Sequence, residues 1–295
     1  MAAAPGAAEN RPSAQEVALI KELETHIEES VNAVFSQPDA SPTVHAVLKA
    51  VAEDLLQRAT AVEEAALPLN EALKLLPPPV DAATFAALRQ KMRALGGTAA
   101  LRAELESKGF VEEGKLTTGV KPFNVFARVA SGVMTQPGME KENENLGAAG
   151  SRFAVCSNLP ANDAQWESAD PEWVGKASMA KRHRFLSSKD LSWEWFNVLA
   201  FGLDGSVAEL SRAIECLEAM QSAAEAFASA TDEWSAEPSH LGLFLHSYPH
   251  NSVNSLHLHM LDLRFTGPTY ENMKYKNLPL SDALAVLRAE LDAAK

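Results

Sequence analysis

Histidines gather in one short stretch of the chain, where they could act together on a substrate. Five of the eight histidines in this 295-residue chain fall between positions 240 and 259. A neutral imidazole can act as a nucleophile or as a metal ligand near pH 7, because its unperturbed pKa is about 6.5. This stretch, which contains His240, His246, His250, His257 and His259, is therefore the most informative part of the sequence for function.

The segment 253–261 has the alternation of a β-strand that presents histidines on one face. His257 and His259 are two positions apart, so both project from the same face of a strand. Leu256, Leu258 and Met260 occupy the opposite face, and these large apolar residues are predicted to pack on the core. The two histidines would then be held by a rigid element, as a reactive site requires.

Three interpretations of this strand compete. The histidines could be two polar residues on a solvated strand face. Neighbouring imidazoles on one face could instead chelate zinc, with His246 or His250 as a third ligand. The favoured interpretation is a nucleophilic histidine, which needs no metal and no other cofactor.

The same segment resembles the signature of the histidine triad (HIT) superfamily. That signature alternates three histidines with apolar residues, often after a Gln-Ser-Val or Asn-Ser-Val turn. Residues 251–261 read Asn-Ser-Val-Asn-Ser-Leu-His-Leu-His-Met-Leu, so Ser255 stands in the position of the first histidine. Residues 180–191 resemble, less closely, the family's Pro-Lys-x-His…Asp-Leu segment that precedes a long helix. The resemblance covers about residues 117–295.

The resemblance implies nucleotide chemistry. In the family the middle histidine, here His257, attacks the α-phosphate of a nucleotide and forms a covalent nucleotidyl-histidine that water hydrolyses. A backbone carbonyl two residues upstream, here that of Ser255, orients the ring, and His259 would contact the phosphate or the leaving group. The implied activity is that of a hydrolase or nucleotidyl transferase acting on a phosphoramidate, a phosphoanhydride or a dinucleoside polyphosphate.

The resemblance also assigns residues to substrate binding. The turn before the strand would hold phosphate oxygens. Asn158 stands near the place of an acidic residue that binds ribose hydroxyls in the family, and it has no carboxylate. The residues assigned in this way are Asn158, Lys181, His183, Asn251, Ser252 and Ser255.

Two departures from the family pattern support an alternative function. Ser255 cannot act as an imidazole acid or base, and the ribose-binding carboxylate is replaced. The alternative is therefore a catalytically weakened nucleotide-binding or protein-interaction module.

In addition, residues 161–175, with Trp166 and Trp173, look inserted and are either a surface loop or a cover for the pocket. The basic cluster at 176–184 either binds a phosphate or is a solvated surface.

The first part of the chain is predicted to be helical. Residues 1–12 are Ala-rich and are expected to form a flexible tail. From 13 to 115, apolar residues recur every three or four positions, which indicates an antiparallel helical bundle or a pair of helical hairpins. Breaks fall at Pro38, at 77–79 and at Gly96–Gly97. These helices could recruit a protein partner.

The second part, 116–295, is predicted to be an α+β domain with an antiparallel sheet. Strands are expected at 123–129, 152–156 and 241–246. Ser206 and Glu209 form a capping box that begins a long helix, and a last helix covers 281–294. The long helix is expected to bury Val207, Leu210, Ile214, Leu217 and Phe227.

Composition narrows the class of protein. A net charge of −13 argues against an extended nucleic-acid surface, which needs clustered basic residues. No apolar run approaches the roughly 20 residues of a transmembrane helix. The chain has two cysteines, Cys156 and Cys216. This small number favours a cytoplasmic protein without a disulfide framework. A homodimer is the expected state, with a nucleotide or a nucleotide conjugate as ligand.

Overall fold

The computed structural model describes residues 18, 20–22, 24, 25, 29, 49–55, 67–231, 234 and 237–295. The chain divides into two compact units, Met1–Leu75 and Leu76–Lys295. The tail predicted at 1–12 lies outside the described residues, as do most positions of the helices predicted between 13 and 66.

In the first unit, the described positions between 18 and 29 are helical, as is the segment 49–55. Helix α3 (Leu69–Lys74) ends before the proline run that the sequence marks as a break. The next two helices, α4 (Ala82–Ala94) and α5 (Gly97–Ser107), belong to the second unit. The boundary between the two compact units therefore lies within the predicted helical region 13–115.

Local signals set the ends of α4 and α5. The Asp81 carboxylate accepts the backbone N–H of Thr84 at 2.8 Å, and the Thr84 hydroxyl accepts the Asp81 N–H at 3.2 Å. This reciprocal capping box satisfies two donors at the start of α4. Gly96 separates the two helices with φ of +105°, a conformation that favours glycine.

The second unit is built on a five-stranded antiparallel sheet, which confirms the predicted α+β class. The strand order is β3-β4-β6-β5-β7. In β6, His259 lies opposite Phe185 of β4 and Phe244 of β5, so the histidine strand is central in the sheet. The bounds are β3 Phe153–Cys156, β4 His183–Ser188, β5 Leu241–Leu245, β6 His257–Asp262 and β7 Leu278–Pro279.

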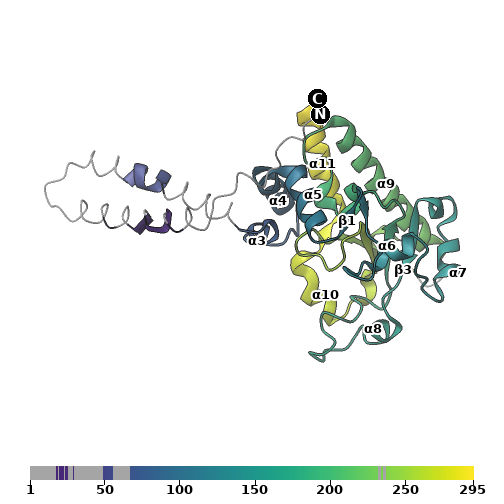
Figure 1. Ribbon diagram of the computed structural model, residues 1–295. Helices are drawn as coiled ribbons and strands as arrows, with labels where there is room; N and C mark the ends of the chain where they lie inside the picture. Colours follow the sequence, from purple (N-terminus) through teal and green to yellow (C-terminus); the bar gives the residue numbers. More distant parts are fainter. Residues whose placement is uncertain are drawn as a thin grey trace. The chain divides into compact units, whose positions relative to one another are not determined.

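The two faces of the sheet differ in what covers them. Leu258 and Met260 of β6 belong to the main apolar core, together with buried residues of α9 (Val207–Ala230) and α11 (Leu280–Ala294). These two helices lie side by side (Figure 1). On the other face, Phe126 of α6 (Val125–Ala130) packs on Phe185 with ring centroids 5.2 Å apart. The histidines of β6 share that second face.

The structure corrects two predictions about these elements. The strand expected at 123–129 is helix α6 instead, because the Asn124 side chain caps the Ala127 N–H at 3.2 Å. Its apolar residues at helical spacing then pack on the sheet. Val207 is 41% exposed rather than buried, although the other four residues of the predicted α9 stripe are buried.

The remaining elements are short. A hairpin of two strands, β1 and β2, follows α5, and helices α7, α8 and α10 lie in the connections (Figure 1). Within the described ranges, no helix combines the length and the apolar character that crossing a membrane requires. The bounds are β1 Val111–Glu112, β2 Lys115–Leu116, α7 Met139–Glu144, η2 Gly147–Ser151, α8 Pro160–Ala164, η3 Trp193–Phe196, η4 Val198–Ala200, η5 Pro238–His240, η6 Leu263–Phe265, α10 Pro268–Met273 and η7 Lys274–Lys276.

Candidate functional site

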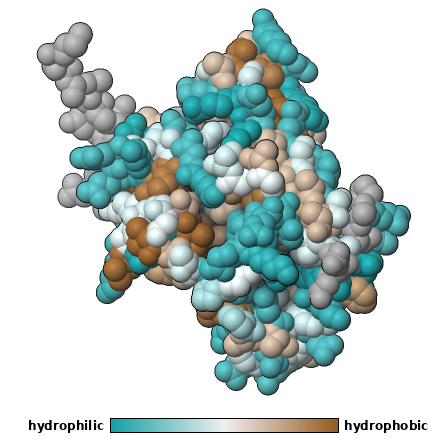
Figure 2. All heavy atoms as spheres, turned by 90° about the vertical axis from the view of Figure 1, so that its right-hand side faces the viewer, coloured by the Kyte–Doolittle hydropathy of each residue, from teal (hydrophilic) through white to brown (hydrophobic). Residues whose placement is uncertain are grey.

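A cavity of about 390 Å³ lies on the histidine face of the sheet. Its volume falls within the range of small-molecule sites. The space-filling view shows one face of the molecule, where apolar side chains gather in a patch between hydrophilic regions (Figure 2). The cavity is lined by Phe123, Val125, Phe126, Met134, Gln136, Ser157, Asn158, Leu159, Asn162, Gly175, Lys176, Ala177, Met179, His183, Phe185, His246, Ser252, Val253, His257, His259, Thr269, Met273 and Lys276.

His257 is held in the orientation that a nucleophile needs. Its Nδ1 lies 2.6 Å from the Ser255 carbonyl oxygen, so Nδ1 carries the hydrogen and donates it. The Nε2 lone pair is therefore left for reaction. The ring packs against Phe126 at 4.6 Å and Phe185 at 5.9 Å between centroids. Burial lowers the pKa of His257 to about 4, so the imidazole is neutral at pH 7.

His183 and His259 form a chain of hydrogen bonds that fixes both tautomers. The Met179 backbone N–H donates to His183 Nδ1 at 3.3 Å. His183 must then carry its hydrogen on Nε2, which donates to His259 Nδ1 at 3.1 Å. His259 consequently carries its hydrogen on Nε2. That atom is buried and has no hydrogen-bond partner among the described residues, so the donor is available to a ligand.

His246 completes a group of four imidazoles. Its ring lies 4.0 Å from that of His259 between centroids, and its Nε2 lies 2.8 Å from Asn277 Oδ1. Burial lowers the pKa of His246 and of His183 to about 3, and it holds the pKa of His259 well below the usual value. All four rings are therefore neutral near pH 7. No group of three His, Cys, Asp or Glu residues among those described is arranged to hold a metal ion.

The turn before β6 contributes two lining residues, Ser252 and Val253. Ser252 lines the cavity and is exposed. Asn251 does not line it, because its Nδ2 donates to Val253 O at 2.7 Å and to Asn254 Oδ1 at 2.9 Å. Ser255 is buried outside the lining and contributes its backbone carbonyl. Of the three turn residues that the resemblance assigns to substrate binding, Ser252 is the one that lines the cavity.

The other predicted binding residues are divided between the cavity and the surface. Asn158 lines the cavity, where its Nδ2 donates to Ser178 Oγ at 2.7 Å. Lys181 is exposed outside the lining, with its Nζ 5.6 Å from the centre of the Phe265 ring. The structure thus brings His183, His257, His259, Ser252 and Asn158 together around one cavity.

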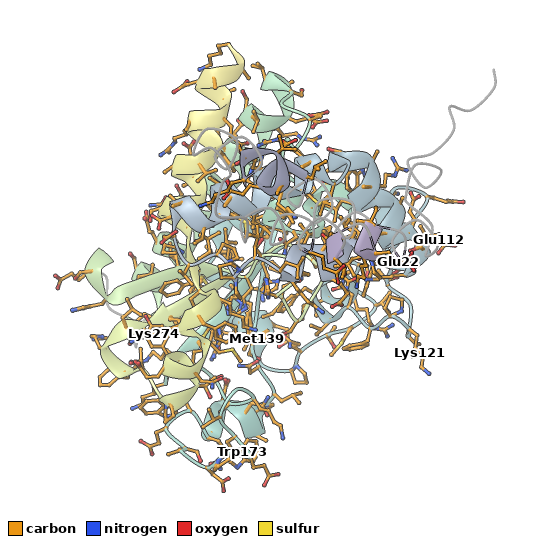
Figure 3. All side chains as sticks on the ribbon, turned by 90° about the vertical axis from the view of Figure 1, so that its left-hand side faces the viewer. Glu22, Glu112, Lys121, Met139, Trp173 and Lys274 are labelled. Carbon is orange, nitrogen blue, oxygen red and sulfur yellow. The ribbon has the colours of Figure 1, made fainter. Side chains whose placement is uncertain are left out.

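Ion pairs neutralise part of the basic cluster at 176–184. Arg182 pairs with Asp262 at 2.8 Å, and Arg184 pairs with Glu142 at 2.7 Å. Lys176 is exposed at the cavity instead. The segment that the sequence marks as inserted also borders the cavity, through Asn162 and Gly175. Trp173, labelled at the lower end of Figure 3, lies in this segment.

The electrostatic character of the lining is one-sided. Among the described residues that form it, none is an aspartate or a glutamate, whereas Lys176 and Lys276 both belong to it. The imidazoles supply neutral donors and lone pairs. Such a lining attracts an anion and leaves the apolar wall for an uncharged part of the ligand.

The sequence does not identify two contributors to the site. Lys276 lies outside the histidine motif, but it is a buried lining residue. Phe126 is placed on a strand, but it packs on His257 from a helix. The Asn124 cap is the one local signal that could have indicated that helix.

Comparisons with protein-family models, with curated proteins and with solved structures give no match to this chain.

Proposed function

We propose that the cavity is the active site of a nucleotide hydrolase or nucleotidyl transferase in which His257 attacks the α-phosphate. The observation that carries the proposal is the 2.6 Å hydrogen bond from His257 Nδ1 to the Ser255 carbonyl oxygen. It fixes the tautomer that exposes the Nε2 lone pair in a ligand-sized cavity. The resemblance to the histidine triad superfamily supplies the substrate class: a phosphoramidate, a phosphoanhydride or a dinucleoside polyphosphate.

The proposed reaction has two steps. In the first, the lone pair of His257 Nε2 forms a bond to phosphorus while the bond to the leaving group breaks. The electron pair stays with the leaving group, which takes a proton from solvent. The ring now bears a positive charge, and the Ser255 carbonyl oxygen that accepts Nδ1–H stabilises it. In the second step water attacks phosphorus, the N–P bond breaks, and a nucleoside monophosphate leaves as water gives up a proton.

The environment of His257 suits this chemistry. Because burial keeps the imidazole neutral at pH 7, the nucleophile needs no separate base. The buried Nε2–H of His259 provides a donor for a phosphate oxygen. The lining has no carboxylate among its described residues that would repel the phosphate. The rings of Phe123 and Phe126 offer an apolar surface for a nucleobase.

Hydrolysis of a substrate panel tests the proposal. The panel contains an adenosine phosphoramidate, a guanosine phosphoramidate, a dinucleoside polyphosphate and a capped dinucleotide. We expect release of nucleoside monophosphate by the wild type and a loss of roughly 1,000-fold or more in His257→Ala. His240→Ala is the matched control, because His240 is a histidine outside the cavity lining. Equal turnover by wild type and His257→Ala would refute the proposal.

A nucleotide-binding module without turnover is the second candidate. Ser255 favours it, because a serine there offers no imidazole to protonate a leaving group. This candidate predicts micromolar nucleotide binding by calorimetry together with no hydrolysis by the wild type. Turnover that appears only in Ser255→His would identify a site that has lost its acid.

A further inference from the structure

Lys276 is a buried lysine without an acidic partner. Its residue is 6% exposed, at the end of η7. Its Nζ lies 3.4 Å from the His250 carbonyl oxygen and 5.9 Å from the centre of the Tyr275 ring. Within the described part of the chain, no carboxylate lies at ion-pair distance from this ammonium. One long hydrogen bond to a neutral oxygen leaves most of its charge uncompensated.

A buried charge of this kind is costly and usually acquires a partner. Removing an ammonium from water costs several kcal/mol unless hydrogen bonds or an opposite charge replace the lost solvation. Burial accordingly lowers the pKa of Lys276. A lysine used only for packing would place its ammonium in solvent, as Lys176 and Lys274 do. The position of Lys276 therefore needs another explanation.

The surroundings of Lys276 point toward the reacting groups. It lines the same cavity as His246, His257 and His259. Its neighbour Asn277 is buried and accepts the hydrogen bond of His246 Nε2–H at 2.8 Å. The segment that carries the lysine is thus fastened to the imidazole group. His259 Nε2 is another donor in the cavity, and it has no hydrogen-bond partner among the described residues.

We infer that Lys276 is a catalytic residue that binds the phosphate of the substrate, and that the bound phosphate is its missing counter-ion. This inference rests on the proposed function, in which a phosphate group enters the cavity beside His257. The lysine lies outside the histidine motif and reaches the site from η7, after the strand that carries the nucleophile. In the transition state the ammonium and His259 Nε2–H together stabilise the charge on the phosphate oxygens.

Calorimetry with adenosine 5′-monophosphate and with adenosine tests this role on the full chain. We expect Lys276→Met to weaken binding of the monophosphate by roughly 10- to 100-fold and to leave adenosine binding unchanged. Lys276→Arg, which keeps the charge, should recover most of the affinity. Lys274→Met is the matched control, because Lys274 (labelled in Figure 3) is an exposed lysine of the same η7, paired with Glu271 at 2.7 Å.

The outcomes separate this inference from the proposed function. Binding does not require turnover, so the titrations are repeated with His257→Asn as the parent. If the wild type fails to hydrolyse any substrate but Lys276→Met still loses monophosphate binding selectively, the proposed hydrolase activity fails and the phosphate-binding role of Lys276 stands. The inference is refuted if Lys276→Met binds the monophosphate within threefold of wild type, if adenosine binding falls equally, or if the wild type binds no monophosphate. Where turnover exists, Lys276→Met should lower kcat as well as raise KM.

Discussion

Arg89 and Lys276 are both buried cations of the second compact unit, yet their surroundings differ in kind. Arg89 is fully buried, and its guanidinium donates to both Glu290 oxygens and to the carbonyl oxygens of Leu199 and Phe201, at 2.6–3.2 Å. Lys276 has one carbonyl at 3.4 Å. The charge of Arg89 is therefore balanced by groups of the protein itself, and Arg89 has a structural role.

The difference shows how a structural charge can be told from a functional one. Arg89 and Arg93 of α4 share Glu290 of α11, so the cluster fastens two helices of the core. Although burial by itself raises the pKa of Glu290, hydrogen bonds from both arginines outweigh it and hold the pKa below its usual value. The Lys276 region holds an unsatisfied cation and an unsatisfied imidazole donor instead. In the role inferred above, the phosphate of the substrate is the partner of both groups.

The largest expected effect comes from breaking the satisfied cluster. Glu290→Ala leaves the buried Arg89 without its counter-ion, which should lower the free energy of unfolding by about 3–5 kcal/mol. Urea unfolding monitored by circular dichroism measures this change. A loss below about 1 kcal/mol would mean that the cluster is no more structural than a surface pair.

Acid should begin to weaken the two regions at different pH values. The four cavity histidines have pKa values in the folded state below the unfolded value of about 6.5. As the pH falls below 6.5 the unfolded chain binds more protons than the folded one, so stability decreases by up to about 1.4 kcal/mol per pH unit for each histidine. This loss continues to about pH 4 for His257 and to about pH 3 for His183 and His246. The contribution of Glu290 persists above its unfolded value of about 4.5 and is lost below it.

Urea unfolding at pH 7, 6 and 5 checks the histidine range. His246→Gln keeps a donor for Asn277 and removes one titrating group, so it should reduce the slope by up to about 1.4 kcal/mol per pH unit. Glu290→Gln should leave the slope between pH 7 and 5 unchanged. Equal stability of the wild type at pH 7 and pH 5 would contradict the assignment of four neutral buried imidazoles.

The sequence predicts those helices and strands whose signals lie within the segment itself, such as alternation of apolar residues and helix caps. The alternation around His257 and His259 predicts a strand with its histidines on one face, as β6 shows. The Ser206 side chain caps α9 as expected, but the Ser206 N–H donates to Asp204 Oδ1, so the capping box predicted with Glu209 is only half formed. Helix α6 was mistaken for a strand, because β-branched residues at Val125 and Val129 suggest a strand when the capping role of Asn124 is not considered.

The sequence could not predict features that depend on distant contacts. Lys276 becomes buried because η7 lies against the turn at His250. The residues next to Lys276 in the sequence carry no pattern that predicts this contact. The basic cluster likewise suggested a phosphate site. Arg182 and Arg184 are instead paired with Asp262 and Glu142, which lie far away in the chain. Which charges stay unpaired is a property of the fold and has no local pattern.

The smallest expected effect comes from an ion pair that also joins two helices but is exposed to solvent. Arg288 of α11 contacts Glu218 of α9 at 2.6 Å, but their side chains are 54% and 47% exposed. Solvent and salt screen such a pair, so Glu218→Ala should cost less than about 1 kcal/mol, and its coupling to Arg288→Ala should shrink further in 1 M salt. A double-mutant cycle measures this coupling. If it equalled the effect of Glu290→Ala, burial would not be what separates a structural ion pair from a surface one, and the same reasoning would fail for Lys276.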